Sequence, residues 1–149
     1  MHESTPIPDL LRELFASQQL AVLATDHGGQ PYVSLVAFAV SDDLRELLFA
    51  TNRDTRKFAN LKANNRVSLL IDNRSNQIAD FSQAIAVTLL GAGEELAEAD
   101  RSVGEALYLA KHPHLEKFVT SPGCALVRVQ LKSCYLVSRF QDVVEYHFA

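Results

Sequence analysis

Six or seven short segments of the chain are rich in apolar residues, which either alternate with polar ones or run without interruption. Both patterns are typical of β-strands, because a strand buried on one face alternates and a strand buried on both faces does not. The fifth segment is expected to end at Gly91 and Gly93, and the sixth to bend near Ser133 and run on towards Phe140. The expected strands cover residues 20–25, 32–40, 47–51, 66–71, 85–89, 127–140 and 142–148.

Other stretches repeat apolar residues at helical spacing. A first helix is expected over residues 8–18, a short one after Asp54 or Thr55, either of which can cap it, and a third after the acidic residues 94–100. The apolar stripes are Leu10, Leu11, Leu14 and Phe15 in the first helix and Val103, Ala106, Leu107 and Ala110 in the third. Residues 115–119 are expected to add a further short helix.

The connections between the expected strands are short, which indicates antiparallel pairing. Residues 20–25 and 32–40 are apolar on both faces, so each needs cover on both sides. A closed barrel with helices or a second subunit packed outside provides that cover. We therefore predict one domain over residues 1–149, mainly β, with an antiparallel barrel of six or seven strands and about three peripheral helices.

The composition is that of an ordinary globular protein, with 48% hydrophobic and 21% charged residues. Residues 1–6 lack the basic start and apolar centre of a signal peptide, and no apolar run is long enough to span a membrane, so we expect a cytoplasmic protein without a membrane partner. A net charge of −4 argues against nucleic acid as a partner. Cys124 and Cys134 fit no metal-binding spacing and are expected to be buried thiols; no metal site is predicted.

The turn between strand 47–51 and the short helix concentrates polar donors. They are Thr51, Arg53, Thr55, Arg56 and Lys57. Free N–H groups at a helix start, beside hydroxyls and cations, suit a phosphate group. Residues 53–74 carry a net charge of +4 in a chain of net charge −4, which favours a small anionic ligand over a polyanion. A solvated basic helix face explains the same pattern, and the spacing alone leaves both interpretations open.

This segment resembles the central signature of the flavin-binding split β-barrel family related to pyridoxamine 5′-phosphate oxidase. The matching residues are Phe49-Ala50-Thr51-Asn52, Thr55-Arg56-Lys57, Leu61 and Asn65-Arg66-Val67-Ser68-Leu69-Leu70. The resemblance extends in order over most of the chain. It implies a split barrel of Greek-key type that binds FMN. The residues implied to hold the FMN phosphate are Thr51, Thr55, Arg56 and Lys57.

The resemblance also implies where the isoalloxazine ring lies. In the family, the ring follows the strand after a turn that is here Gly29-Gln30-Pro31. The implied backbone contacts are Ser34, Leu35, Val36 and Ala37. Gln83 stands where the family has a glutamine that contacts the flavin. Two subunits form the flavin cleft in the family, so a homodimer is expected.

The sequence differs from that of pyridoxamine 5′-phosphate oxidase itself at positions that matter for the activity of that enzyme. Residues 32–37 lack the basic residue that the oxidase has at each end of this segment, and the chain has no Trp to match the oxidase's C-terminal Trp and Arg signature. We therefore do not expect oxidation of pyridoxamine phosphate. Residues 107–113 and 137–140 look more like a small branch of the superfamily whose relatives include haem-utilisation proteins.

Three functions fit these observations. The leading one is an FMN-dependent oxidoreductase acting on a small molecule that the sequence does not name. The second is a haem-binding or haem-degrading protein, for which His147 is the candidate ligand. The third is a non-catalytic module that binds a phosphorylated ligand or a deazaflavin. His112 and His114 are expected in an exposed loop that could border the cleft, and no residue is assigned a catalytic role.

Overall fold

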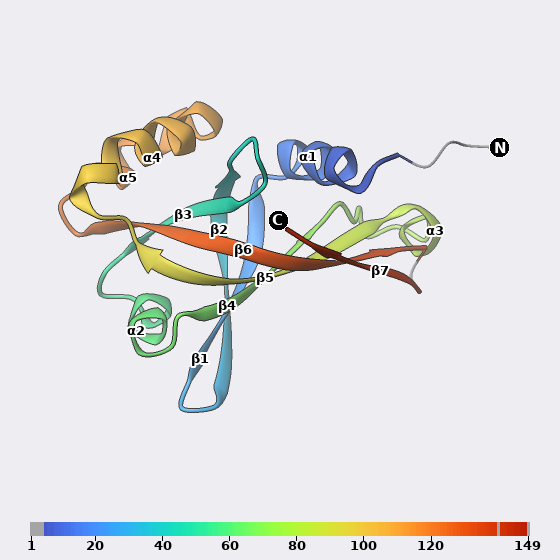
Figure 1. Cartoon of the computed structure of the whole chain (residues 1–149), viewed down its shortest axis with the longest axis horizontal. Helices are drawn as coiled ribbons and strands as arrows, with labels where there is room; N and C mark the ends of the chain where they lie inside the picture. The colour runs from blue at the N-terminus through green and yellow to red at the C-terminus, as the bar shows by residue number, and fades with distance from the viewer. Residues whose placement is uncertain (1–4, 140, 149) are drawn as a thin grey trace.

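The computed structural model describes residues 5–139 and 141–148, so Phe140, at the expected end of the sixth strand, lies outside the described residues. The strands are β1 (Leu20–His27), β2 (Gln30–Val40), β3 (Glu46–Asn52), β4 (Arg66–Asp72), β5 (Ile85–Glu95), β6 (Cys124–Ser138) and β7 (Asp142–His147) (Figure 1). The helices are α1 (Ile7–Ser17), α2 (Arg56–Ala63), α3 (Asp80–Gln83), α4 (Glu98–Lys111) and α5 (Glu116–Val119), and a 3₁₀ turn, η1 (Pro113–Leu115), precedes α5.

The strands form an antiparallel barrel. Their order in the sheet is β3-β2-β1-β4-β5-β6-β7, and a further pairing of β3 with β6 closes the first six strands into a ring. β7 continues the sheet outside the ring by pairing with β6. The predicted fold class, mainly β with an antiparallel barrel and peripheral helices, is confirmed. None of the described helices is long and apolar enough to cross a membrane.

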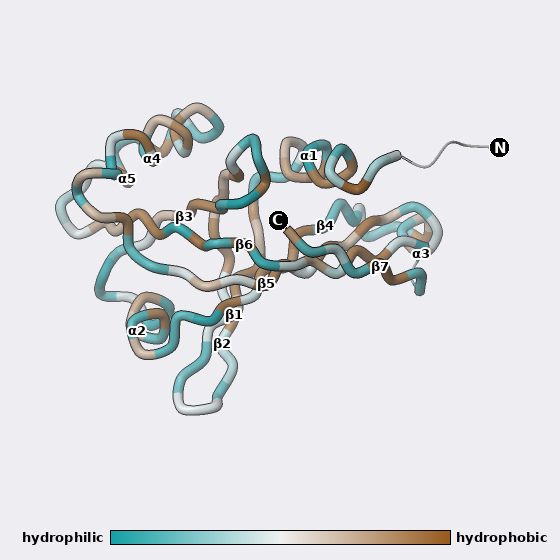
Figure 2. Tube along the Cα trace, in the orientation of Figure 1, coloured by the Kyte–Doolittle hydropathy of each residue, from teal (hydrophilic) through white to brown (hydrophobic). Residues whose placement is uncertain are grey.

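Residues of the six strands in the ring, β1 to β6, fill the barrel. Leu23, Phe38, Leu69, Leu89 and Val127 are fully buried there, and α1 adds the apolar stripe that was predicted for it. A second apolar cluster lies outside the barrel, between α4 and the strands β2, β3 and β6. In Figure 2 the hydrophobic positions lie mostly along the strands and helices, and the connecting loops are largely hydrophilic. The barrel therefore has one filled interior and one helix-covered outer face.

β2 changes its neighbour part-way along its length. Gln30–Ala37 pair with β1, whereas only Phe38–Val40 pair with β3. Beyond that point β3 keeps its pairing with β6, through Ala50–Asn52 opposite Leu126–Cys124. Because β2 and β3 diverge here, their facing edges are not joined by the backbone hydrogen bonds that link other neighbouring strands.

Two sequence-based expectations about β5 and α4 were wrong. β5 does not end at its glycines: it runs on to Glu95, with a shift of register between Leu90 and Gly91. The helix α4 turns a different face to the sheet than its apolar stripe suggested, because Val103 is 75% exposed while Gly104 and Tyr108 are buried. A glycine allows close approach of the helix, and the Tyr ring then supplies the buried area.

Candidate functional site

A pocket of about 300 Å³ opens where β2 and β3 part. β2 and the end of β3 form two of its walls, and the start of α2 and the segment from α4 to α5 form the others. Its lining residues are Leu35, Val36, Ala37, Ala50, Thr51, Asn52, Thr55, Lys57, Tyr108, Leu115 and Phe118. The pocket thus combines an unpaired strand edge, an apolar wall and a helix start.

The helix start is organised by two threonines. Thr55 is the N-cap of α2, and its Oγ1 accepts a hydrogen bond from the Phe58 N–H at 3.3 Å. The same hydroxyl donates to the Asn52 carbonyl oxygen at 2.9 Å and lies 2.9 Å from Thr51 Oγ1. Thr51 is 2% exposed, so its hydroxyl is held at the buried end of this network. Two hydroxyls and the first turn of a helix therefore meet at one corner of the pocket.

The cations of this turn have different surroundings. Lys57 is partly buried and lines the pocket, whereas Arg56 is exposed and does not line it. Arg53 points elsewhere: its Nη2 lies 2.6 Å from Glu95 Oε2 and its Nη1 donates to the Pro122 carbonyl at 2.9 Å. Of the residues in this basic segment, Lys57 is the cation that the fold directs to the pocket.

The structure brings together six of the nine residues that the resemblance implied for a cofactor. They are Leu35, Val36, Ala37, Thr51, Thr55 and Lys57. Ser34, Arg56 and Gln83 do not line the pocket. Ser34 alternates with the outward-facing Leu35, and its buried Oγ has no hydrogen-bond partner within the described part of the chain. Gln83 belongs to α3, at the far end of the molecule from α2 (Figure 1).

The wall formed by α4 and α5 was not foreseen from the sequence as part of a site. Tyr108 is fully buried, and its hydroxyl donates to the Ala37 carbonyl at 3.0 Å. Burial raises the pKa of Tyr108 to about 12, and a hydrogen bond with the Ala50 backbone acts against that rise. Phe118, which is 36% exposed, stands at the mouth of the same pocket.

His112 was expected in an exposed loop, and this expectation was wrong. It is the C-cap of α4 and only 1% exposed, with Nε2 2.8 Å from the Phe38 carbonyl oxygen. Since a carbonyl only accepts, Nε2 carries the proton that is donated. Burial lowers the pKa of His112, so the ring is held neutral. His114 is exposed, and His147 pairs with Glu145, Nε2 to Oε2, at 2.7 Å on β7.

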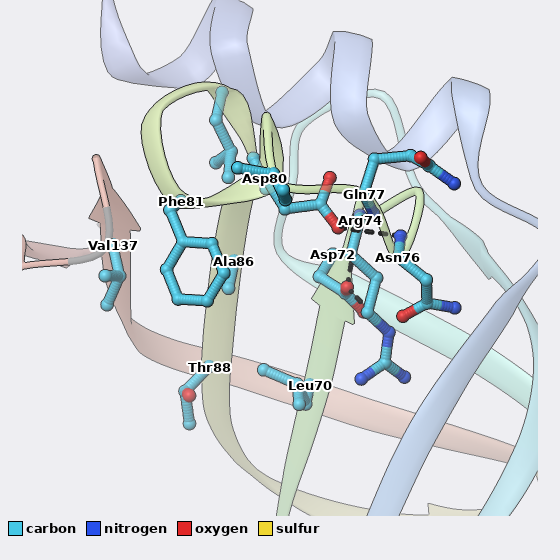
Figure 3. Close-up of a pocket in the computed structure, with 13 residues that line it drawn as sticks. Leu70, Asp72, Arg74, Asn76, Gln77, Asp80, Phe81, Ala86, Thr88 and Val137 are labelled. Atoms are coloured by element: carbon cyan, nitrogen blue, oxygen red, sulfur yellow. Dashed lines mark hydrogen bonds and ion pairs between the residues drawn. The ribbon is translucent and has the colours of Figure 1, made fainter.

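A larger pocket of about 690 Å³ lies on the outer face of β4, β5 and β6, under the segment that carries α3. Its floor includes Leu70, Ala86 and Val137, and Phe81 extends over these strands from α3 (Figure 3). Asp80 accepts hydrogen bonds from the backbone N–H groups of residues 75–77 and so fixes the loop. The floor of this pocket is apolar, and polar side chains line one side of it: Asp72, Arg74, Asn76, Gln77 and Asp80.

No cluster of three or more His, Cys, Asp or Glu side chains that could hold a metal ion occurs among the described residues. Cys124 and Cys134 are both buried thiols, as predicted.

A model of the family described as pyridoxamine 5′-phosphate oxidase matches residues 7–138, which is most of the chain. The chain belongs to this family. The resemblance noted in the sequence is thereby confirmed at the level of the family. The sequence has no significant match among curated proteins.

Solved structures of related fold carry different descriptions. A haem-binding protein from Mycobacterium smegmatis superposes with a TM-score of 0.85 at 16% identity over 98% of this chain, which spans 60% of that protein. A FAD-binding protein from Mesorhizobium loti gives 0.67 at 19% identity, covering 84% of this chain and 89% of that one. A putative pyridoxamine 5′-phosphate oxidase from Listeria innocua gives 0.71 at 14% identity, covering 89% and 98%. Because the sequence identities are this low, the likeness to these structures establishes only the fold of the present chain.

Proposed function

We propose that this protein binds FMN in the pocket between β2 and β3 and acts as an oxidoreductase on a small molecule. The observation that carries the proposal is the corner formed by Thr51, Thr55 and Lys57, which lies next to an unpaired edge of β2. A dianionic phosphate needs donors and positive charge, and a flat ring needs a backbone edge with small side chains. The pocket offers both kinds of surface side by side.

The donors at the corner fit a phosphate group. The Thr55 hydroxyl donates to the Asn52 carbonyl, and the Thr51 hydroxyl lies 2.9 Å from that of Thr55. A phosphate oxygen is a stronger acceptor than a carbonyl, so rotation of either hydroxyl turns it into a donor to the ligand. Lys57 adds the charge from the first turn of α2, whose N-terminal end itself favours an anion.

FMN, when bound, supplies the electron-transfer chemistry, and the residues of this chain bind and orient it. The ring would lie along Leu35–Ala37, where backbone groups face the gap left by β3. Tyr108 and Phe118 form an apolar wall that limits access of water from the side of α4 and α5. The substrate would approach whichever face of the ring these walls leave open.

The same proposal includes a homodimer. The outer face of the barrel carries a row of residues across five neighbouring strands: Leu35, Val22, Leu70, Thr88 and Tyr135. On the same face Val33 is 63% exposed and Leu35 66%. A contiguous apolar surface on a sheet favours association with a second copy. Because Leu35 also lines the pocket, the partner would cover the open side of the cofactor site.

Haem binding is the second candidate, and the likeness to the haem-binding protein from Mycobacterium smegmatis favours it. The exposed side chain of His147 is the accessible imidazole on β7, once its contact with Glu145 is released. His112 does not suit this role, because its Nε2 is already bonded within the protein.

Reconstitution of the purified protein with FMN, with haemin and with a deazaflavin tests the proposal. We expect a flavin absorbance band that survives gel filtration, quenched flavin fluorescence, and reduction by a nicotinamide donor. Replacing Arg56 and Lys57 together by Ala should weaken FMN binding by about 2–4 kcal/mol while the fold is kept. A Soret band that His147→Ala abolishes, without any flavin binding, would instead establish the haem function. Tight binding without turnover would leave a non-catalytic module.

A further inference from the structure

The hydroxyl of Tyr108 occupies the place where the ladder between β2 and β3 would continue. The last two residues that pair along this ladder towards the pocket are Phe38 and Phe49. In an antiparallel sheet the next pair along would be Ala37 and Ala50. Instead, the Tyr108 hydroxyl donates to the Ala37 carbonyl at 3.0 Å, and it lies near enough to the Ala50 backbone for that group to lower the pKa of Tyr108.

The backbone directions of the two strands show that these groups face each other across the gap. The Phe38 N–H donates to Gln19, on the β1 side, so the polar groups of its neighbour Ala37 point towards β3. On β3, the Glu46 carbonyl accepts from Ser41 of the chain that leaves β2. Ala50 lies four residues further along the strand and so also faces β2. The phenol hydroxyl therefore takes up the Ala37 carbonyl, which in a continued ladder would pair with the Ala50 N–H.

Contacts of three neighbouring residues fix the part of α4 that carries Tyr108. His112, one turn later, donates to the Phe38 carbonyl at 2.8 Å. The Lys111 ammonium donates to the Phe15 carbonyl at the end of α1 and lies 3.8 Å from the centre of the Phe38 ring. On the other side, Gly104 brings α4 close to Leu96. The helix cannot shift along β2 without breaking these contacts.

We infer that Tyr108 is a positioning residue that holds β2 and β3 apart and so keeps the cofactor pocket open. The inference rests on the proposed function as far as the ligand is concerned. Its structural content is that loss of one oxygen atom lets the Ala50 N–H donate directly to the Ala37 carbonyl. The ladder then extends by one pair, and the walls that carry Val36 and Thr51 move together.

The experiment compares the full-length protein with the variants Tyr108→Phe and Tyr146→Phe. Tyr146 is the matched control, because its ring packs against Phe148 in a contact that Phe retains. FMN affinity is measured by fluorescence quenching, and the strand gap by the NMR scalar coupling through a hydrogen bond from Ala50 N to the Ala37 carbonyl carbon. We expect Tyr108→Phe to bind FMN about tenfold more weakly and to show the coupling. The wild type and the control should lack the coupling and bind equally well.

Wild-type affinity in Tyr108→Phe, or no coupling in that variant, would overturn the inference. If the wild type itself does not bind FMN, the proposed function fails, but the coupling still decides whether Tyr108 holds the strands apart. Should Tyr108→Phe not fold, the wild type supplies the test: a nuclear Overhauser contact between the Tyr108 hydroxyl proton and the Ala50 amide is required. Its absence would refute the bridging role.

Discussion

The hydroxyl oxygens of Thr51 and Thr55 lie 2.9 Å apart, one at the end of β3 and the other at the N-cap of α2. This contact joins the strand to the helix across the turn that approaches the pocket. Since the Thr55 hydroxyl also donates to the Asn52 carbonyl, one side chain holds both the turn and the helix start. The proposed phosphate corner is thus held in place by hydrogen bonds within the fold.

Thr55→Ala is expected to destabilise the protein by about 1 kcal/mol, because it removes the cap of the Phe58 N–H and the partner of Thr51. Thr55→Ser keeps the hydroxyl and should retain nearly all the stability. Denaturant unfolding of both variants measures the difference. Equal stability of the Ala and Ser variants would show that the cap contributes nothing.

Lys57→Ala should weaken FMN binding by about 1.5–3 kcal/mol, whereas Arg56→Ala should change it by less than about 0.5 kcal/mol. The reason is that Lys57 lines the pocket and Arg56 is exposed away from it. Lys62→Ala, on the exposed part of the same helix, is the control for the loss of a positive charge. Titration at two salt concentrations measures the three affinities. A larger effect of Arg56 than of Lys57 would contradict this arrangement of the site.

Val33→Asp should raise the dissociation constant of the proposed homodimer at least about tenfold, because it places a charge on the apolar outer face of β2. Val103→Asp is the matched control, since Val103 is 75% exposed on α4, away from that face. Sedimentation velocity over a range of protein concentrations distinguishes the two variants. A protein that is monomeric throughout, or a Val103 variant that dissociates equally, would remove the support for this interface.

The barrel could be predicted because the apolar pattern of each strand is visible in a short stretch of sequence. The corner of the pocket could also be predicted from a short stretch, since Thr51, Thr55 and Lys57 belong to one continuous segment. The α4 wall could not be predicted in this way. Tyr108 is far from Ala50 along the chain, and only the closed topology of the barrel brings the two residues together.

The errors have identifiable physical causes. The face of α4 that carries Val103 was predicted to be buried because its residues are apolar. Gly104, however, allows the closest approach to the sheet and so decides which face of α4 is buried. His112 is buried because the Phe38 carbonyl needs a donor where α4 ends, a requirement that no local pattern reveals.

The stability of the protein should fall as the pH drops below about 6.5, in part because of His112. Burial lowers the pKa of His112 in the folded protein, so the unfolded chain takes up its proton first. Its contribution to stability is therefore complete above the unfolded pKa and is lost as the pH falls below it. His112→Gln, whose amide can still donate to the Phe38 carbonyl, should flatten the dependence. Denaturant midpoints between about pH 7.5 and 5.5 compare the two proteins; parallel curves would exclude His112 as the cause.

Gly91→Ala should destabilise the protein by about 1–3 kcal/mol. A methyl group there would lie 2.4 Å from the Gln130 carbonyl oxygen, and a backbone atom of β6 cannot move aside as a side chain can. β5 and β6 also shift register next to this residue, so the strain falls on the pairing of these two strands. Gly123→Ala is the control, because a methyl group at that position meets no atom within 4 Å. Thermal melting should show a clear loss for the first variant and no loss for the second, and equal melting temperatures would mean that β5 and β6 pack less closely at the register shift than the structure indicates.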